Sequence, residues 1–131
     1  MTIQQLSVFL ENRAGQLSGV TELLAANHID MQALNIAETA DYGVLRLIVD
    51  MPQRAAGLLR EHGFIVRETP VVLAPVSDKP GGLNAVLSNI AAADIDIEYM
   101  YSGMGQKNGL AYMIFRVSEP EKLDHVLTGL V

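Results

Sequence analysis

Two loops of this chain carry the residue types that could bind a small charged molecule. They read Asn12-Arg13-Ala14-Gly15-Gln16-Leu17 and Asp78-Lys79-Pro80-Gly81-Gly82-Leu83, and they align without a gap at an offset of 66 residues. An aspartate follows each loop at the same offset, Asp30 after the first and Asp96 after the second. A repeat of this length indicates two copies of one small module.

Each loop is predicted to lead from the end of a strand into the start of a helix. The first amides of a helix have no partner within it, and the helix dipole is positive at that end. Glycine has no side chain, so an anion can approach the backbone at Gly15 or Gly81 and a carboxylate or small phosphate fits there. Taken alone, the first loop favours a simpler interpretation, in which Asn12 caps the helix and Gly15 permits the turn.

The aspartates add a second kind of binding group. Asp30 and Asp96 are each flanked by apolar residues, so each carboxylate must find a donor or face solvent. If the modules pack as a pseudo-twofold pair, Asp96 is expected to point toward the loop at 12–17, and Asp30 toward the loop at 78–83. Amides for a carboxylate and an acid for an ammonium make a site for a free amino acid. The alternative is a turn aspartate that bonds its own backbone.

Apolar spacing predicts the elements that position these residues. The first module is expected to have strands at 6–11, 29–38, 44–49 and 64–68, helices at 15–27 and 52–63, and a turn at 39–43. The second is expected to have strands at 71–76, 95–102 and 110–117, a loose hairpin loop at 103–109, and helices that begin near Pro80 and Pro120. The second module therefore lacks a fourth strand of its own, and one sheet edge is open unless something covers it.

This order predicts an α+β fold made of two ferredoxin-like βαββαβ modules packed as a pseudo-dimer, residues 1–69 and 70–131. Half of the 131 residues are apolar and 18% are charged, which is typical of a chain with a buried core. The net charge of −6 argues against nucleic acid or an anionic membrane as a partner. The chain has no cysteine, no signal peptide and no apolar run long enough to cross a bilayer, so we expect a cytoplasmic protein.

The loop pattern N-x-x-G-x-L, followed by a helix and then Ile29-Asp30-Met31, resembles the ACT domains. Asp78 to Leu83 with Ile95-Asp96-Ile97 matches the same pattern, with aspartate in place of the usual asparagine. The resemblance covers nearly the whole chain and implies a stand-alone, non-catalytic, allosteric regulator that binds a free amino acid between its two modules. It implies no cofactor and no metal. The open sheet edge of the second module predicts a protein partner, either a second copy of the chain in a homo-oligomer such as a homodimer, or a target metabolic enzyme.

The resemblance implies two ligand-binding sites. The first contains Asn12, Arg13, Ala14, Gly15, Gln16 and Leu17 with Asp96 of the other module. The second contains Asp78, Lys79, Gly81, Gly82 and Leu83 with Asp30. Asp78 would place a negative charge beside an incoming carboxylate, so we expect the first site to bind more tightly and Asn12→Asp to weaken it.

Two other functions compete with a sensor. A small ferredoxin-like enzyme, for example an acyl phosphate hydrolase, would use the loop with Arg13 and an asparagine, but no nucleophile, base or metal set accompanies the loop. The three histidines show no metal-binding spacing. A protein-interaction module whose pockets stay empty is the other alternative.

Overall fold

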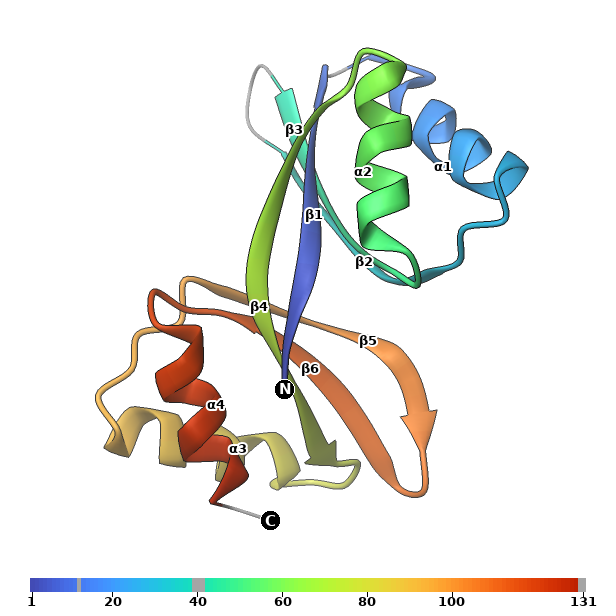
Figure 1. The fold of residues 1–131 in the computed structure, drawn as a ribbon. Helices are drawn as coiled ribbons and strands as arrows, with labels where there is room; N and C mark the ends of the chain where they lie inside the picture. Colours follow the sequence, from blue (N-terminus) through green and yellow to red (C-terminus); the bar gives the residue numbers. More distant parts are fainter. Residues whose placement is uncertain (12, 39–41, 130–131) are drawn as a thin grey trace. The chain divides into compact units, whose positions relative to one another are not determined.

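The computed structural model describes residues 1–11, 13–38 and 42–129, and it divides into two compact units. The first unit comprises residues 4–69, and the second comprises residues 70–131 together with Met1–Ile3 (Figure 1). The boundary falls within two strands, because β1 (Thr2–Glu11) and β4 (Ile65–Ser77) each begin in one unit and end in the other. None of the described helices is long and apolar enough to cross a membrane.

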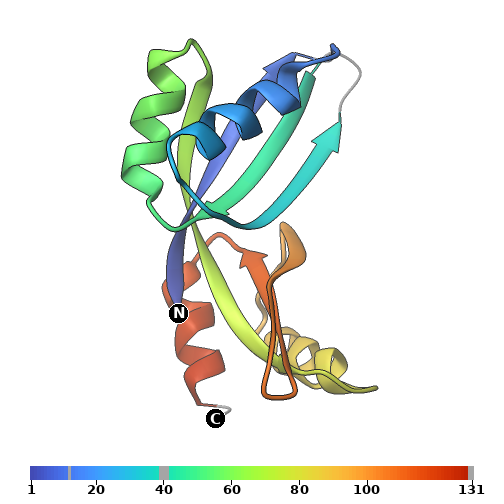
Figure 2. The same cartoon turned by 90° about the vertical axis from the view of Figure 1, so that its right-hand side faces the viewer.

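The first unit has the predicted βαββαβ order. After β1 it contains α1 (Gln16–Ala26), β2 (Met31–Glu38), β3 (Tyr42–Val49), α2 (Pro52–Glu61) and the start of β4. Its strands lie in the order β2-β3-β1-β4, and β3 runs antiparallel to both β2 and β1. Both helices lie on one face of this sheet (Figure 2).

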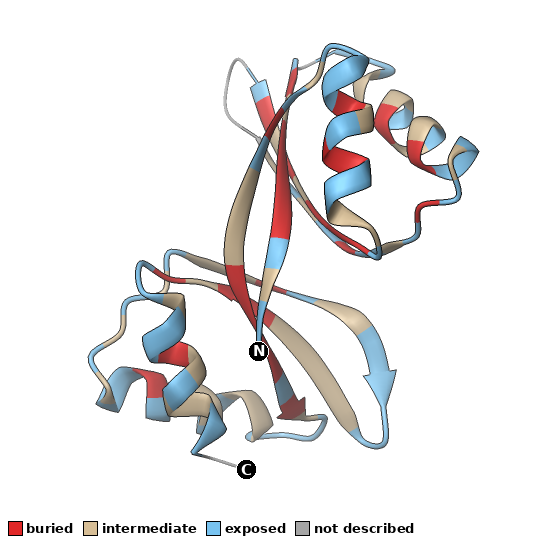
Figure 3. Cartoon of the chain, viewed as in Figure 1, coloured by how far each residue is buried: buried red, intermediate tan, exposed pale blue. Residues whose placement is uncertain are grey.

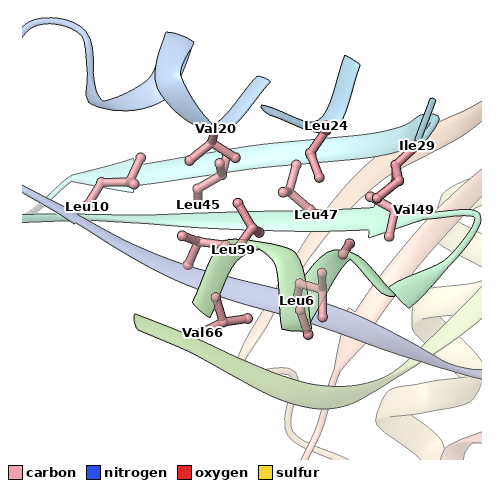
Figure 4. Close-up of a cluster of buried hydrophobic side chains, with 13 residues drawn as sticks. Leu6, Leu10, Val20, Leu24, Ile29, Leu45, Leu47, Val49, Leu59 and Val66 are labelled. Atoms are coloured by element: carbon pink, nitrogen blue, oxygen red, sulfur yellow. The ribbon is translucent and has the colours of Figure 1, made fainter. Parts of the chain in front are cut away.

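The core of the first unit lies between that sheet face and the helices. Leu6, Val8 and Leu10 alternate along β1 and are buried, as strand alternation predicts. Leu24 from α1 and Leu59 from α2 complete the cluster with other aliphatic residues (Figures 3 and 4). The burial of these side chains holds β1 and α1 in place, and the first loop runs from the end of β1 to the start of α1.

The second unit repeats this arrangement. It contains the end of β4, α3 (Gly82–Ala92), β5 (Tyr99–Lys107), β6 (Leu110–Arg116) and α4 (Pro120–Thr128). The strands lie in the order β4-β6-β5 and pair antiparallel. The core is smaller, with six fully buried members: Val72, Ala74, Ile90, Phe115, Val117 and Leu123.

Residues Met1–Ile3 lie beside β4 in the second unit, on the side away from β6. The Leu73 amide donates to Met1 O at 2.8 Å, and the Met1 ammonium donates to Leu73 O at 3.1 Å. The same ammonium lies 2.6 Å from Asp124 Oδ1 on α4. The edge that the sequence leaves open is therefore covered in part, by the opposite end of the chain.

Several boundaries differ from the sequence-based expectations; β5, for example, begins at Tyr99 and not at Ile95. The strands predicted at 64–68 and 71–76 are one strand, β4, because Pro70 and Pro75 fit an extended backbone without ending it. The loose loop predicted at 103–109 is mostly strand: β5 reaches Lys107, with a register shift between Ser102 and Gln106. The turn itself is Asn108-Gly109, both at positive φ, which is typical of a tight hairpin. Of the turn predicted at 39–43, residues 39–41 lie outside the described residues.

Candidate ligand-binding site

The two repeated loops have the same backbone geometry. Gly15 and Gly81 both have φ 88° and ψ −11°, a left-handed conformation that glycine adopts without steric cost. The amides of Gly19 and Ala85 each donate to the carbonyl of that glycine at 3.0 Å. The two loops are therefore alike in backbone conformation as well as in sequence, and each starts its helix in the same way.

The residues that the structure describes provide no side-chain cap for either helix. No side chain of the described residues bonds the first amides of α1 or α3. In the second loop, the Gly82 amide is satisfied locally by Lys79 O at 3.0 Å. Asp78, which could instead have capped α3, does not do so, and Asn12, the predicted cap of α1, lies outside the described residues.

A pocket of about 470 Å³ lies at the second loop, within the second unit. Three residues of the predicted site line it: Lys79, Gly81 and Gly82. The remaining lining comes from the end of β4, one face of α3 and the last turn of α4: Ala74, Pro75, Ser77, Pro80, Ala85, Val86, Asn89 and Leu127. Asp78 and Leu83 are not part of the lining.

In the first loop, the described residues are mostly exposed. Arg13 Nε forms an ion pair with Glu11 Oε2 at 2.9 Å, with both side chains largely in solvent. Ala14 and Gly15 are exposed, Gln16 is partly buried, and Leu17 is 39% exposed. A large apolar side chain left this exposed on a helix is available to a ligand or to another surface.

The two aspartates lie after equivalent turns. His28 and Asp94 have positive φ, 56° and 57°, and the following isoleucine amides close each helix by donating to Leu24 O and Ile90 O. Asp30 is exposed directly before β2, and its amide donates to Asp50 Oδ1 at 3.0 Å. It lines a pocket of about 470 Å³ in the first unit with Ala25, His28, Ile29 and Met31.

Asp96 is also exposed, but it lies three residues before β5 begins at Tyr99. Of the nearby tyrosines, Tyr101 is buried, and its ring stacks on that of Tyr99 with centroids 6.5 Å apart. Neither ring lines the pocket at the second loop. Among residues 1–11, 13–38 and 42–129, no group of three or more His, Cys, Asp or Glu side chains could hold a metal ion.

The duplicated βαββαβ unit, with a glycine loop before each first helix, defines a class of paired α+β modules. The family model for an ACT domain pair matches residues 1–129, and this chain belongs to that family. The resemblance inferred from the two loops is thereby confirmed. A comparison with curated proteins finds no match.

Solved structures share the fold. A protein from Bacteroides thetaiotaomicron is 42% identical, with a TM-score of 0.92 over 99% of this chain and 89% of that one. The ligand-free regulatory subunit of aspartate kinase from Thermus thermophilus is 15% identical, with a TM-score of 0.64 over 99% and 95% of the two chains. The corresponding subunit from Thermus flavus is 11% identical, with a TM-score of 0.62 over 98% and 94%.

The sequence patterns did not reveal the apolar part of the pocket at the second loop. Val86 and Leu127 were predicted only as members of the helices that begin near Pro80 and Pro120, and Ala85 was not singled out. The available signal was the missing fourth strand, because a helical face that normally packs beneath a strand is left without that cover. The open edge was interpreted only as a surface for a second copy of the chain or a target enzyme.

Proposed function

We propose that this chain is a non-catalytic regulator that senses a free amino acid through its two glycine loops. The observation that supports it most is that both copies start their first helix at a left-handed glycine with the same backbone angles. Of the first helix amides, those of Gln16 and Gly82 donate to Arg13 O and Lys79 O. The amides that follow them suit a ligand carboxylate.

The family supports the regulatory part of the proposal. The Thermus thermophilus neighbour is a regulatory subunit, and its ligand-free form has the same fold as this chain. A ligand regulates by binding one arrangement of the protein more tightly than another. The regulated partner, either a second copy of this chain or a metabolic enzyme, stays a prediction.

In the proposed site, an aspartate receives the ammonium group of the ligand. Asp30 and Asp96 are both exposed and positioned by equivalent turns, so either carboxylate is available to a ligand. The pairing of each aspartate with the loop of the other module stays a prediction. The order of affinity, with the loop at 12–17 binding more tightly, also stays a prediction.

A thermal-shift screen against the twenty amino acids tests the proposal, because a ligand of the folded state raises the melting temperature. With an amino acid that responds, calorimetry should show about tenfold weaker binding in Asp96→Asn, since one charged contact to the ammonium is lost. Glu61→Gln removes an exposed carboxylate outside the candidate site and should bind as the unchanged protein does.

Two results would contradict the proposal. If none of the twenty amino acids changes the melting temperature, the chain is not an amino-acid sensor, and an interaction module becomes the better interpretation. If an amino acid or an acyl phosphate is chemically altered during incubation, the chain is an enzyme.

A further inference from the structure

The pocket at the second loop lies where the first unit has a filled core. β1 and β4 are equivalent in the repeat, and so are α1 and α3. Val8 in β1 is completely buried, whereas its equivalent Ala74 has a shorter side chain and lines the pocket. Val20 in α1 is completely buried, whereas its equivalent Val86 in α3 is only partly buried and also lines the pocket.

The second helices of the two units differ in the same way. α2 and α4 both begin with proline, at Pro52 and Pro120, after residues with similar backbone angles. Counting from these prolines, Leu59 and Leu127 are equivalent. Leu59 is 0% exposed and shares its cluster with Val66 of β4 (Figure 4), whereas Leu127 is partly exposed and lines the pocket.

The fourth strand accounts for this difference. In the first unit, Val66 enters the core from the start of β4, the fourth strand of the βαββαβ unit. In the second unit, Met1–Ile3 takes the place beside β4, and Met1 both donates to and accepts from the Leu73 backbone. The part of β4 beyond Leu73 borders the pocket through Pro75 and Ser77.

The free side of β4 is poorly suited to pairing with another strand. The amide and the carbonyl of Leu73 both point toward Met1. Because backbone groups alternate between the two sides of a strand from one residue to the next, those of Pro75 and Ser77 point to the same side as those of Leu73. Pro75 has no N–H to donate. Gly82 lies directly against the Ser77 carbonyl, because a Cβ on Gly82 would overlap that oxygen. This edge offers a partner strand few hydrogen bonds, which favours a small molecule as the occupant.

The lining indicates which small molecule fits. Ala74, Val86 and Leu127 make part of the lining aliphatic, and the exposed Lys79 adds a cationic side chain to it. A pocket of about 470 Å³ is within the usual range of about 300 to 1,000 Å³ for small-molecule sites. We propose that this pocket binds a small carboxylate with a branched aliphatic group, which packs where a fourth-strand side chain packs in the first unit. The proposal rests on the proposed sensor function and names the ligand class for the second loop.

The test uses two probes that share this chemistry. Leucine carries an ammonium group, and 4-methylpentanoate has the same branched end and carboxylate without one. Both should raise the melting temperature and shift the methyl NMR signals of Val86 and Leu127. Binding of 4-methylpentanoate should weaken about tenfold in Lys79→Gln, whereas the neutral 4-methylpentanamide should bind this variant and the unchanged protein equally.

Filling the pocket provides the matched comparison. Ala85→Leu adds a larger side chain to the lining at an exposed helix position, so the variant should fold normally and lose at least tenfold in affinity for both probes. Ala91→Leu makes the same change on the same helix, at an exposed residue outside the lining, and should bind as the unchanged protein does.

The outcomes separate this proposal from the sensor function. Undiminished binding of both probes in Ala85→Leu overturns the pocket assignment, and the sensor function still holds if amino acids bind. If 4-methylpentanoate binds, Ala85→Leu abolishes this binding and no amino acid gives a response, the pocket assignment is supported and the sensor function is overturned. A failure of both probes to shift the Val86 and Leu127 signals overturns the pocket assignment outright.

Discussion

At the scale of single residues, alanine substitutions at three glycines distinguish the cost of backbone strain from the cost of a steric clash. Gly81 has φ 88° with open space around a Cβ, so Gly81→Ala should cost about 1 kcal/mol of unfolding free energy through strain alone. Gly82→Ala should cost more, toward the upper end of about 1–3 kcal/mol for overpacking, because its Cβ would meet Ser77 O. Urea denaturation measures both changes.

Gly57 is the control for this pair. It lies in α2 with open space around a Cβ, so Gly57→Ala should stabilise the protein by about 0.5–1 kcal/mol. If Gly81→Ala also stabilised the protein, the left-handed geometry of the loop would be wrong. A loss for Gly82→Ala no larger than that for Gly81→Ala would contradict the close approach of Gly82 to Ser77.

At the scale of elements, the two second helices should respond differently to the same truncation. Leu59→Ala removes a fully buried side chain and should cost about 2–5 kcal/mol. Leu127→Ala removes a partly exposed side chain that borders a pocket, so its cost should be clearly smaller. Chemical denaturation of both variants measures the difference. Equal losses would show that the pocket is closed in solution and that the second core is as complete as the first.

At the scale of the whole molecule, Met1–Ile3 should stabilise the unit formed by residues 70–131. Deletion of these three residues removes the acceptor of the Leu73 amide and an ion pair to Asp124, so hydrogen exchange at Leu73 should become much faster. The Leu47 amide on β3 in the first unit serves as the internal control. Unchanged exchange at Leu73 in the shortened chain would contradict the pairing of Met1 with β4.

The local pattern was sufficient to predict most elements. Alternation in β1, helical spacing in α1 and the proline starts of α2 and α4 all give the observed elements, because each depends on neighbours a few residues away. β4 was predicted as two strands, 64–68 and 71–76, with a short extended join at Pro70 between them. Whether a proline interrupts depends on which neighbour pairs with it, and a local pattern does not contain that information.

The sequence by itself determined that one βαββαβ module occurs twice and that each copy starts its first helix at a glycine loop, because a duplication is visible as identical residues at a fixed offset. Only the tertiary structure decided what lies beside β4 in the second unit, because residues 1–3 and Leu73 are far apart along the chain. It also decided that a pocket lies at the second glycine loop. Val20 and Val86 are the same residue type at equivalent positions, and their burial differs because their surroundings differ.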